Sequence, residues 1–332
     1  MSFKNELEEA LKKQEISEKI YSIFLQLYES YAASLHKQGL QMEPNDWVFE
    51  EFLKNVKAQI VEPYTFLPYH SRITDPYDYF SFGISFIRPL VDKEKSRLEG
   101  LSNVKEMNKQ LEARENVVLF ANHQTEVDPQ LLSMALEKDC PRISQEIIFV
   151  AGDRVVTDPM AVPFSMGRNL LCIYSKRHIE NPPEKKEEKL LHNQRTMKLM
   201  RELFSEGGKC IYVAPSGGRD RRNENGEVVV SPFDPQSIEM FRLMAKQANR
   251  PTHFYTLALC TYEILPPPKS IEKDVGEMRR ANRDGVLFSF GKELDMERFP
   301  GHELEDRHAR RAALASYIWN IVKKDYDSLK NL

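Results

Sequence analysis

A histidine and an aspartate stand five positions apart in one predicted loop of this 332-residue chain. His123 follows the apolar, β-branched run 117–121, which is typical of a buried strand. Asp128 precedes Pro129 and an apolar-periodic segment, and proline is favoured at the first position of a helix. The pair therefore lies between the end of a strand and the start of a helix, which is where ligand sites form in open α/β sheets.

Imidazole is suited to general-base chemistry near neutral pH, and a carboxylate on its second nitrogen fixes the tautomer. Two other interpretations stay open: Asp128 as a helix N-cap, and His123 as a structural histidine. A nucleophile of the protein's own is disfavoured, because Ala214 replaces the first glycine of a G-x-S-x-G motif around Ser216. If His123 is a base, the attacking hydroxyl therefore belongs to a substrate.

Two basic segments follow predicted strands: 175–178 reads Ser-Lys-Arg-His, and 216–222 reads Ser-Gly-Gly-Arg-Asp-Arg-Arg. Successive parallel strands end at one edge of a sheet, so both segments are expected beside the His123 loop. Glycine lets backbone amides approach an anion, and arginine binds phosphate oxygens with forked geometry. The pattern predicts a phosphate site, with a solvated basic loop as the alternative. No P-loop or dinucleotide-binding motif occurs, so nucleotide use is not indicated.

Strand and helix patterns alternate after residue 115, which predicts an α/β fold with a mixed, largely parallel sheet flanked by helices. The strand candidates are 117–121, 146–151, 170–174, 209–214, 253–260 and 286–290. The helix candidates are 129–138, 184–206, 235–248 and 303–329, the last as scaffold. Asn225-Gly226 predicts a hairpin turn.

The first part of the chain has helical periodicity, and we predict an N-terminal helical domain over residues 1–75 and an α/β domain over 76–332. Residues 68–70 and 75–80 are aromatic and loop-like, and 89–115 are expected to be helical. The triple proline at 266–268 is either one wall of an apolar channel or a rigid exit from a strand.

The composition and the net charge argue against several classes of protein. The net charge of −3 gives no argument for nucleic acid, and no stretch approaches the roughly 20 apolar residues that span a bilayer. The acidic N-terminus resembles neither a secretory signal nor a transit peptide, so cytoplasmic residence is expected. Four separated cysteines without a CxxC pair suggest neither a zinc site nor a disulfide framework; they are Cys140, Cys172, Cys210 and Cys260.

Five collinear motifs resemble the soluble glycerol-3-phosphate 1-O-acyltransferases of plastids and of bacteria such as chlamydiae. They read ANHQTEVDP from Ala121, AGDRVVTDP from Ala151, GRNLLCIYSKRH from Gly167, APSGGRDR from Ala214 and ALCTYEILPPP from Ala258. Together the likeness covers about residues 65–290. The missing transit peptide, in contrast to the plant precursors, favours a cytosolic form.

The resemblance implies acyl transfer from an acyl thioester, carried by acyl carrier protein or coenzyme A, to the sn-1 hydroxyl of glycerol 3-phosphate. It implies no metal and no further cofactor, and at most transient membrane contact. His123 matches the family's catalytic base and Asp128 its partner. The matching phosphate-binding positions are Lys176, Arg177, His178, Arg219 and Arg221. Arg177 departs from the plant pattern, which has lysine there, so the binding geometry is expected to shift.

Three alternatives stay open: a lysophospholipid acyltransferase, a metal-dependent phosphoesterase using His123, Asp128 and Asp153, and a non-catalytic lipid-binding module. Because carrier protein is acidic, Arg279, Arg280 and Arg283 are candidates for its docking patch, with a solvated face as the alternative. Backbone amides at the start of the helix near residue 129 are candidates for an oxyanion donor.

Overall fold

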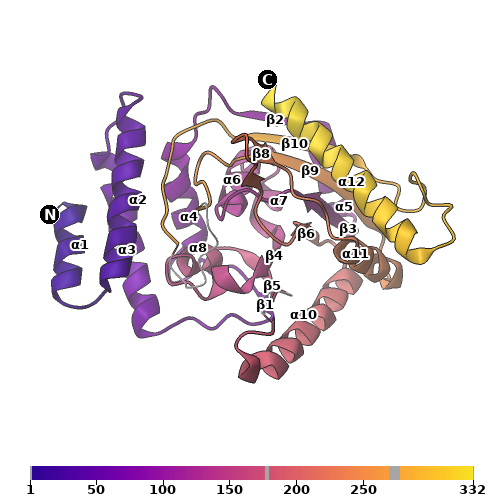
Figure 1. The fold of residues 1–332 in the computed structure, drawn as a ribbon, viewed down its shortest axis with the longest axis horizontal. Coiled ribbons are helices and arrows are strands. Elements are labelled where there is room, and N and C mark those ends of the chain that lie inside the picture. The colour runs from indigo at the N-terminus through magenta and orange to yellow at the C-terminus, as the bar shows by residue number, and fades with distance from the viewer. Residues whose placement is uncertain (1, 176–178, 269–276, 332) are drawn as a thin grey trace.

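The computed structural model describes residues 2–175, 179–268 and 277–331. Its centre is an eight-stranded sheet with the order β1-β5-β4-β6-β3-β9-β10-β2 (Figure 1). Strands β5, β4, β6, β3 and β9 are mutually parallel, whereas β10 runs antiparallel to β9 and β1 antiparallel to β5. The predicted mixed, largely parallel sheet is confirmed. The strand bounds are β1 Tyr69–His70, β2 Arg97–Glu99, β3 Asn116–Ala121, β4 Ile148–Gly152, β5 Asn169–Ile173, β6 Cys210–Val213, β9 Thr252–Cys260 and β10 Leu287–Glu293.

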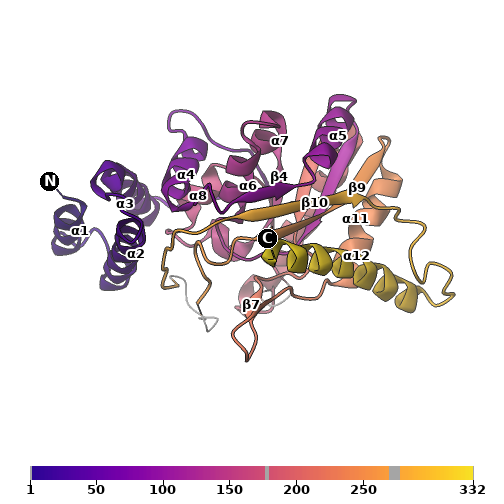
Figure 2. The same ribbon diagram turned by 90° about the horizontal axis from the view of Figure 1, so that it is seen from above.

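Helices cover both faces of this sheet, with α5 and α7 on one side and α12 on the other (Figure 2). Helices α1 to α8 share one apolar core with one face of β3. Helices α10 to α12 share a second core with its other face. The helix bounds are α1 Phe3–Lys12, α2 Glu18–His36, α3 Asp46–Val61, α4 Tyr79–Ile87, α5 Leu101–Glu112, α6 Asp128–Leu136, α7 Pro141–Glu146, α8 Val162–Met166, α10 Lys186–Glu206, α11 Pro235–Gln247 and α12 Arg307–Lys330.

Strand β3 shows why the apolar run predicted a buried strand. Side chains alternate between the two faces of a strand, and in β3 Val117 and Leu119 enter one core while Val118 and Phe120 enter the other. All residues of β3 are buried, because helices cover the sheet on both sides. The loop that carries His123 therefore begins at a strand that is buried along its whole length.

The N-terminal helices α1, α2 and α3 stand at one end of the molecule (Figures 1 and 2). Their aromatic rings continue into the main core: Phe52 lies 5.0 Å from Phe164 of α8, and Phe49 lies 5.3 Å from Phe86 of α4, between ring centroids. Their buried side chains belong to the same apolar cluster as one face of the sheet. The domain boundary at residue 75 stays a prediction.

Three expectations about connecting segments were wrong. Helix α4 begins at Tyr79, inside the segment expected to be a loop, because Asp78 caps its first turn by accepting a hydrogen bond from Ser81 N–H at 2.9 Å. The helix expected over 89–115 covers only α5, which starts after Gly100 at φ 74°, where a Cβ would lie 2.1 Å from Phe290 O. The short strand β1 lies within 68–70, which was expected to be a loop, because it pairs with β5.

The remaining predicted helices and strands lie within a few residues of their expected positions. The Asn225-Gly226 turn does join a hairpin, in which β7 Arg221–Arg222 pairs with β8 Val228–Val229. No helix in the described part of the chain is both long and apolar enough to cross a membrane.

Candidate active site

His123 and Asp128 meet in the loop between β3 and α6. Nδ1 of His123 lies 2.8 Å from Oδ2 of Asp128. The Asp128 side chain is 2% exposed and that of His123 is 28% exposed. Among the described residues, Nε2 of His123 has no hydrogen-bond partner. This is the arrangement of a base: one ring nitrogen is bound to a carboxylate and the other can take a proton from a molecule in solution.

Four donors converge on the Asp128 carboxylate. Besides His123, the backbone amides of Gln124 and Thr125 donate to Oδ2 at 2.8 and 3.2 Å, and the Thr261 hydroxyl donates to Oδ1 at 2.6 Å. The N-cap position of α6 is Val127, and its side chain makes no capping hydrogen bond. The interpretation of Asp128 as an N-cap is therefore wrong: its carboxylate orders the preceding loop, not the helix that follows.

The amides at the start of α6 do not serve as free donors. Gln130 and Leu131 both donate to Val127 O at 3.0 Å, and Pro129 has no N–H. These groups were our sequence-based candidates for an oxyanion donor. Their engagement within the chain argues against that assignment.

A buried hydrogen-bond network ties the His123 loop to the segment after β6. Asp220 N–H donates to His123 O at 2.6 Å. The Asp220 carboxylate accepts from the side chains of Asn122 and Gln124 at 2.8 and 3.2 Å and from Ser231 N–H at 2.9 Å. Burial raises the pKa of Asp220 even though these donors lower it. The network thus ties the backbone between Arg219 and Arg221 to the His123 loop.

The two arginines lie in a basic group that the sequence only partly predicted. Arg219 Nη2 donates to Glu277 Oε2 at 2.7 Å, and Arg154 Nη1 donates to Glu277 Oε1 at 2.7 Å. Arg221 donates to Pro268 O at 2.6 Å. Burial lowers the pKa of Arg221, and the nearby Arg219 lowers it further. An anion with several oxygens suits such a group.

Glycine shapes the turn that leads into this basic group. Gly217 has φ +67°, which favours glycine, and its N–H donates to Ala214 O at 3.1 Å. The hydroxyl of Ser216 donates to Gly218 O at 2.9 Å. Ser216 therefore takes part in the turn and is not bonded to a histidine among the described residues, as the failed elbow motif predicted.

The proposed carrier-protein patch is wrong for two of its three arginines. Arg279 is buried, pairs with Glu126 through two nitrogens, and lies 3.0 Å from Asp158. Although burial alone would raise the pKa of Glu126, Arg279 holds it below its usual range. Arg283 lies 2.6 Å from Asp92, while Arg280 is exposed. Arg279 thus binds one residue in each of two of the motifs, ANHQTEVDP and AGDRVVTDP.

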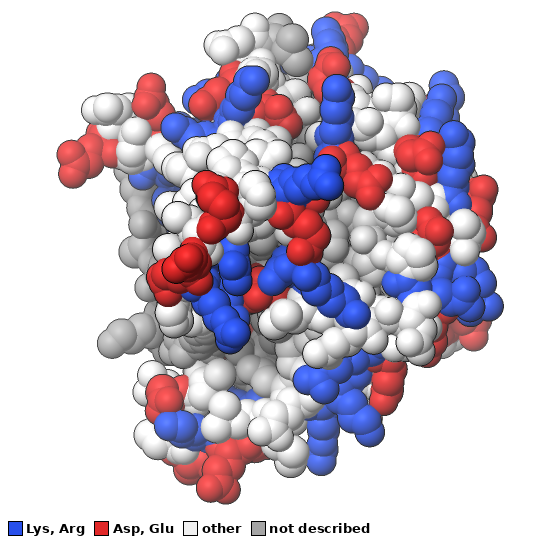
Figure 3. Space-filling view, turned by 90° about the vertical axis from the view of Figure 1, so that its right-hand side faces the viewer, with Lys and Arg blue, Asp and Glu red and all other residues white. Residues whose placement is uncertain are grey.

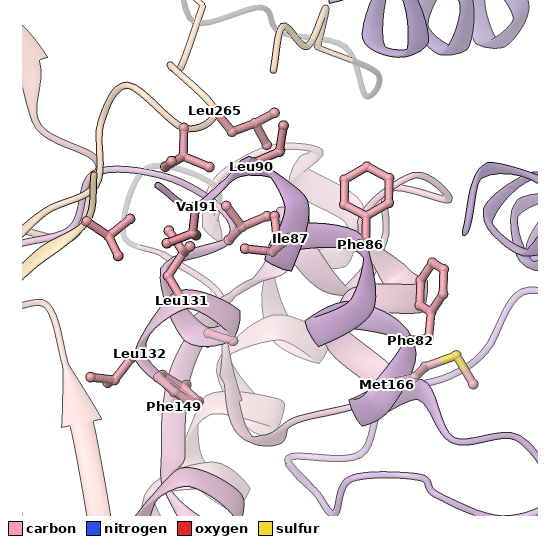
Figure 4. Close-up of a cluster of buried hydrophobic side chains, with 14 of the residues drawn as sticks. Phe82, Phe86, Ile87, Leu90, Val91, Leu131, Leu132, Phe149, Met166 and Leu265 are labelled. Atoms are coloured by element: carbon pink, nitrogen blue, oxygen red, sulfur yellow. The ribbon is translucent and has the colours of Figure 1, made fainter. Parts of the chain in front are cut away.

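The segment before the triple proline also adjoins the His123 loop. The Thr125 hydroxyl donates to Leu265 O at 2.9 Å, and the Leu265 side chain enters an apolar cluster with Leu90, Val91 and Leu131 (Figure 4). These contacts agree with a rigid exit from β9 that helps to fix the loop. A channel wall stays a prediction.

Four of the seven predicted site residues lie in the described part of the chain, and three lie outside it. His123, Asp128, Arg219 and Arg221 come together, whereas Lys176, Arg177 and His178 lie outside the described residues. Sequence reasoning missed Thr261, Arg154 and Glu277. Thr261 follows directly after a predicted strand and Arg154 follows another, and that position was the available signal; Glu277 had none.

Comparison with known proteins gives consistent results. A family model described as Acyltransferase matches residues 96–259. The chloroplastic glycerol-3-phosphate acyltransferase of Spinacia oleracea is 40% identical over 276 residues, which are 83% of this chain and 58% of the relative. That of Arabidopsis thaliana is 38% identical over 273 residues, 82% of this chain and 59% of the relative. The chloroplastic enzyme ATS11 of Cucurbita moschata is 37% identical over 309 residues, 92% of this chain and 69% of the relative.

The chain belongs to the glycerol-3-phosphate acyltransferase family. This confirms the resemblance drawn from the five motifs. The chain spans between 58% and 69% of the length of these three relatives. Among solved structures, the 1-acyl-sn-glycerophosphate acyltransferase PlsC of Thermotoga maritima aligns with a TM-score of 0.40 and 17% identity, over 76% of this chain and 79% of that one. A likeness at that level carries no argument about function.

Proposed function

We propose that this protein transfers a fatty acyl group from an acyl thioester to the sn-1 hydroxyl of glycerol 3-phosphate, giving 1-acyl-glycerol 3-phosphate. The observation that carries the proposal is the His123–Asp128 contact of 2.8 Å, in a loop whose His123 carbonyl oxygen accepts a hydrogen bond from the N–H of Asp220, the residue between Arg219 and Arg221. A base and an anion site side by side suit an acceptor that bears both a hydroxyl and a phosphate. The names of the family relatives agree with this acceptor.

In the proposed reaction, Nε2 of His123 takes the proton of the acceptor hydroxyl as its oxygen attacks the thioester carbonyl. The new C–O bond forms, the C–S bond breaks, and the proton passes from His123 to the leaving thiolate. Asp128 stabilises the imidazolium and, through its three other donors, fixes the ring. No acyl-enzyme intermediate is proposed. Burial supports this for the thiols, because it raises the pKa of Cys172 and Cys210 to about 12 and keeps them protonated.

We propose that Arg219 and Arg221, together with the predicted positions Lys176, Arg177 and His178, bind the acceptor phosphate. Holding the phosphate brings one hydroxyl to His123, and such positioning can contribute about 7–11 kcal/mol to lowering a barrier. No metal and no further cofactor are part of the proposal.

Acyl carrier protein or coenzyme A is the proposed carrier of the acyl group. On the face of the molecule in Figure 3, Lys and Arg side chains lie among Asp and Glu side chains. That mixed surface does not suggest a strongly acidic partner there. Cytoplasmic residence stays a prediction, and the relatives named above are chloroplastic.

A thiol-release assay tests the proposal. The purified protein is given an acyl thioester with and without glycerol 3-phosphate, and the lipid product is identified by mass spectrometry. We expect thiol release that depends on glycerol 3-phosphate and yields the 1-acyl product. Release that requires 1-acyl-glycerol 3-phosphate instead would indicate a lysophospholipid acyltransferase. Phosphate release that a chelator abolishes would indicate a phosphoesterase, and chain binding without release would indicate a lipid-binding module.

A further inference from the structure

Glu277 joins two arginines that come from different loops of the sheet. Each of its carboxylate oxygens accepts one hydrogen bond, from Arg154 and from Arg219, both at 2.7 Å. The Glu277 side chain is 10% exposed and that of Arg219 is 16% exposed. Arg154 follows β4 and Arg219 follows β6, and these strands are neighbours in the sheet. The carboxylate therefore sits where two guanidinium groups converge at the edge that carries His123.

The backbone of Glu277 is fixed to the same edge. Its carbonyl oxygen accepts from Arg279 Nη1 at 3.1 Å, and Arg279 in turn pairs with Glu126 in the His123 loop. The charge of Arg219 also acts on Glu126 and helps to lower its pKa. Glu277, Arg219 and the His123 loop are thus parts of one buried electrostatic group.

The group formed by Arg154, Arg219, Arg221 and Glu277 has a net positive charge, because it holds three arginines and one carboxylate. Besides burial, Arg219 and Arg154 help to lower the pKa of Arg221, and Glu277 is the carboxylate that bridges Arg154 and Arg219. A carboxylate offers two oxygens and one negative charge, whereas a phosphate monoester offers three terminal oxygens and close to two charges. The same two arginines therefore favour a phosphate over Glu277, and a phosphate placed beside Glu277 is repelled by it.

We infer that Arg154 is a further ligand of the acceptor phosphate, and that Glu277 competes with that phosphate for Arg154 and Arg219. Glu277 in this way weakens acceptor binding and sets the concentration at which the site fills. The identity of the ligand rests on the proposed function. The competition itself rests on the contacts of Glu277 and applies to any phosphate monoester.

The test is direct binding of glycerol 3-phosphate and of inorganic phosphate, measured by calorimetry on the full chain. In Glu277→Gln we expect both to bind at least about fivefold more tightly, because a like charge beside the ligand is removed. Glu239 is the matched control, because it also bridges two arginines, Arg242 and Arg311, but lies on α11. Glu239→Gln is expected to leave both affinities unchanged.

The opposite result overturns the inference. If Glu277→Gln binds phosphate no better or more weakly than the parent, Glu277 orients the arginines and does not compete. Should Glu277→Gln be less stable, the rise in melting temperature on adding phosphate is compared within each variant, and a smaller rise than in the parent has the same meaning.

The Arg154→Ala variant tests whether Arg154 is a ligand of the phosphate. We expect at least about fivefold weaker binding of glycerol 3-phosphate. Adding Glu277→Gln to this variant should give a smaller gain than in the parent, because only Arg219 is left to be released. Parent-like binding in Arg154→Ala removes Arg154 from the site. If the chain transfers no acyl group but Glu277→Gln still tightens phosphate binding, the proposed function fails and this inference stands. If acyl transfer is present and binding is not tightened, the inference alone fails.

Discussion

Two of the described histidines that contact carboxylates, His123 and His253, lie at opposite ends of the same strand pair. His253 pairs with Val117 at the start of β3, and His123 follows Ala121 at its end. Nδ1 of His253 lies 2.6 Å from Glu293, and its Nε2 lies 2.9 Å from Glu115. His123 contacts a carboxylate through Nδ1 alone.

The two sites differ in how many ring nitrogens of the histidine are hydrogen-bonded to a carboxylate. His253 can donate to both carboxylates only when both nitrogens carry protons, so it acts as the cation of a surface ion cluster. Burial opposes this charge, but Glu293 and Glu115 together raise its pKa. Among the described residues, Nε2 of His123 stays available to a substrate. Both ring nitrogens of His253 are bound to carboxylates, so neither can accept a proton. A histidine–carboxylate contact therefore indicates a base only when the second nitrogen is available.

The largest effect expected from this comparison concerns turnover. His123→Ala should lower kcat for acyl transfer by about 10²–10⁴, the usual range for loss of a general base. His253→Gln should stay within a few-fold of the parent. Thiol release gives the rates, and circular dichroism checks that both variants are folded. Near-normal turnover in His123→Ala would remove the proposed mechanism.

The next effect concerns the arginines at each end of the sheet. Arg219→Ala should raise the KM for glycerol 3-phosphate by roughly 10–100-fold, since a hydrogen bond to a charged group contributes about 1.5–3 kcal/mol. Arg242 is the matched control, because it is 18% exposed and paired with Glu239, near the His253 end. Arg242→Ala should leave that KM unchanged. A shift confined to the KM for the acyl donor would contradict the phosphate assignment.

A smaller effect is expected from Thr261, which positions His123 through Asp128. Thr261→Val removes the 2.6 Å hydrogen bond to Asp128 and keeps the shape of the side chain. We expect kcat to fall about tenfold at an unchanged KM for glycerol 3-phosphate. Thr261→Ser restores the hydroxyl and should restore kcat. Equal loss in both variants would mean that packing, not the hydrogen bond, matters there.

The smallest effect is a pH dependence of stability at His253. Its pKa in the folded chain is raised above the ordinary value of 6.5. The stabilisation is therefore complete below 6.5 and is lost as the pH rises through the higher folded value. Urea unfolding of the parent and His253→Gln should show a larger difference in unfolding free energy at about pH 6 than at about pH 9. A difference that grows with pH would contradict the ion cluster.

The amino-acid sequence by itself determined the alternation of strands and helices after residue 115 and the placement of His123, Arg219 and Arg221 after strands. These features follow from local patterns: apolar β-branched runs, proline at a helix start, and turn residues. Because parallel strands end at one edge, the same patterns were enough to predict that the His123 loop and the basic segment after β6 meet, as they do.

Only the tertiary structure decided what each charged side chain contacts. The sequence offered Asp128 as a helix cap, but the fold supplies two amides and Thr261, which lies 133 positions away. The sequence predicted Arg279 as a surface residue, whereas in the structure it is buried and paired with Glu126 and Asp158. Such partners are distant in sequence, and burial and charge pairing depend on which segments the folded chain brings within a few ångströms.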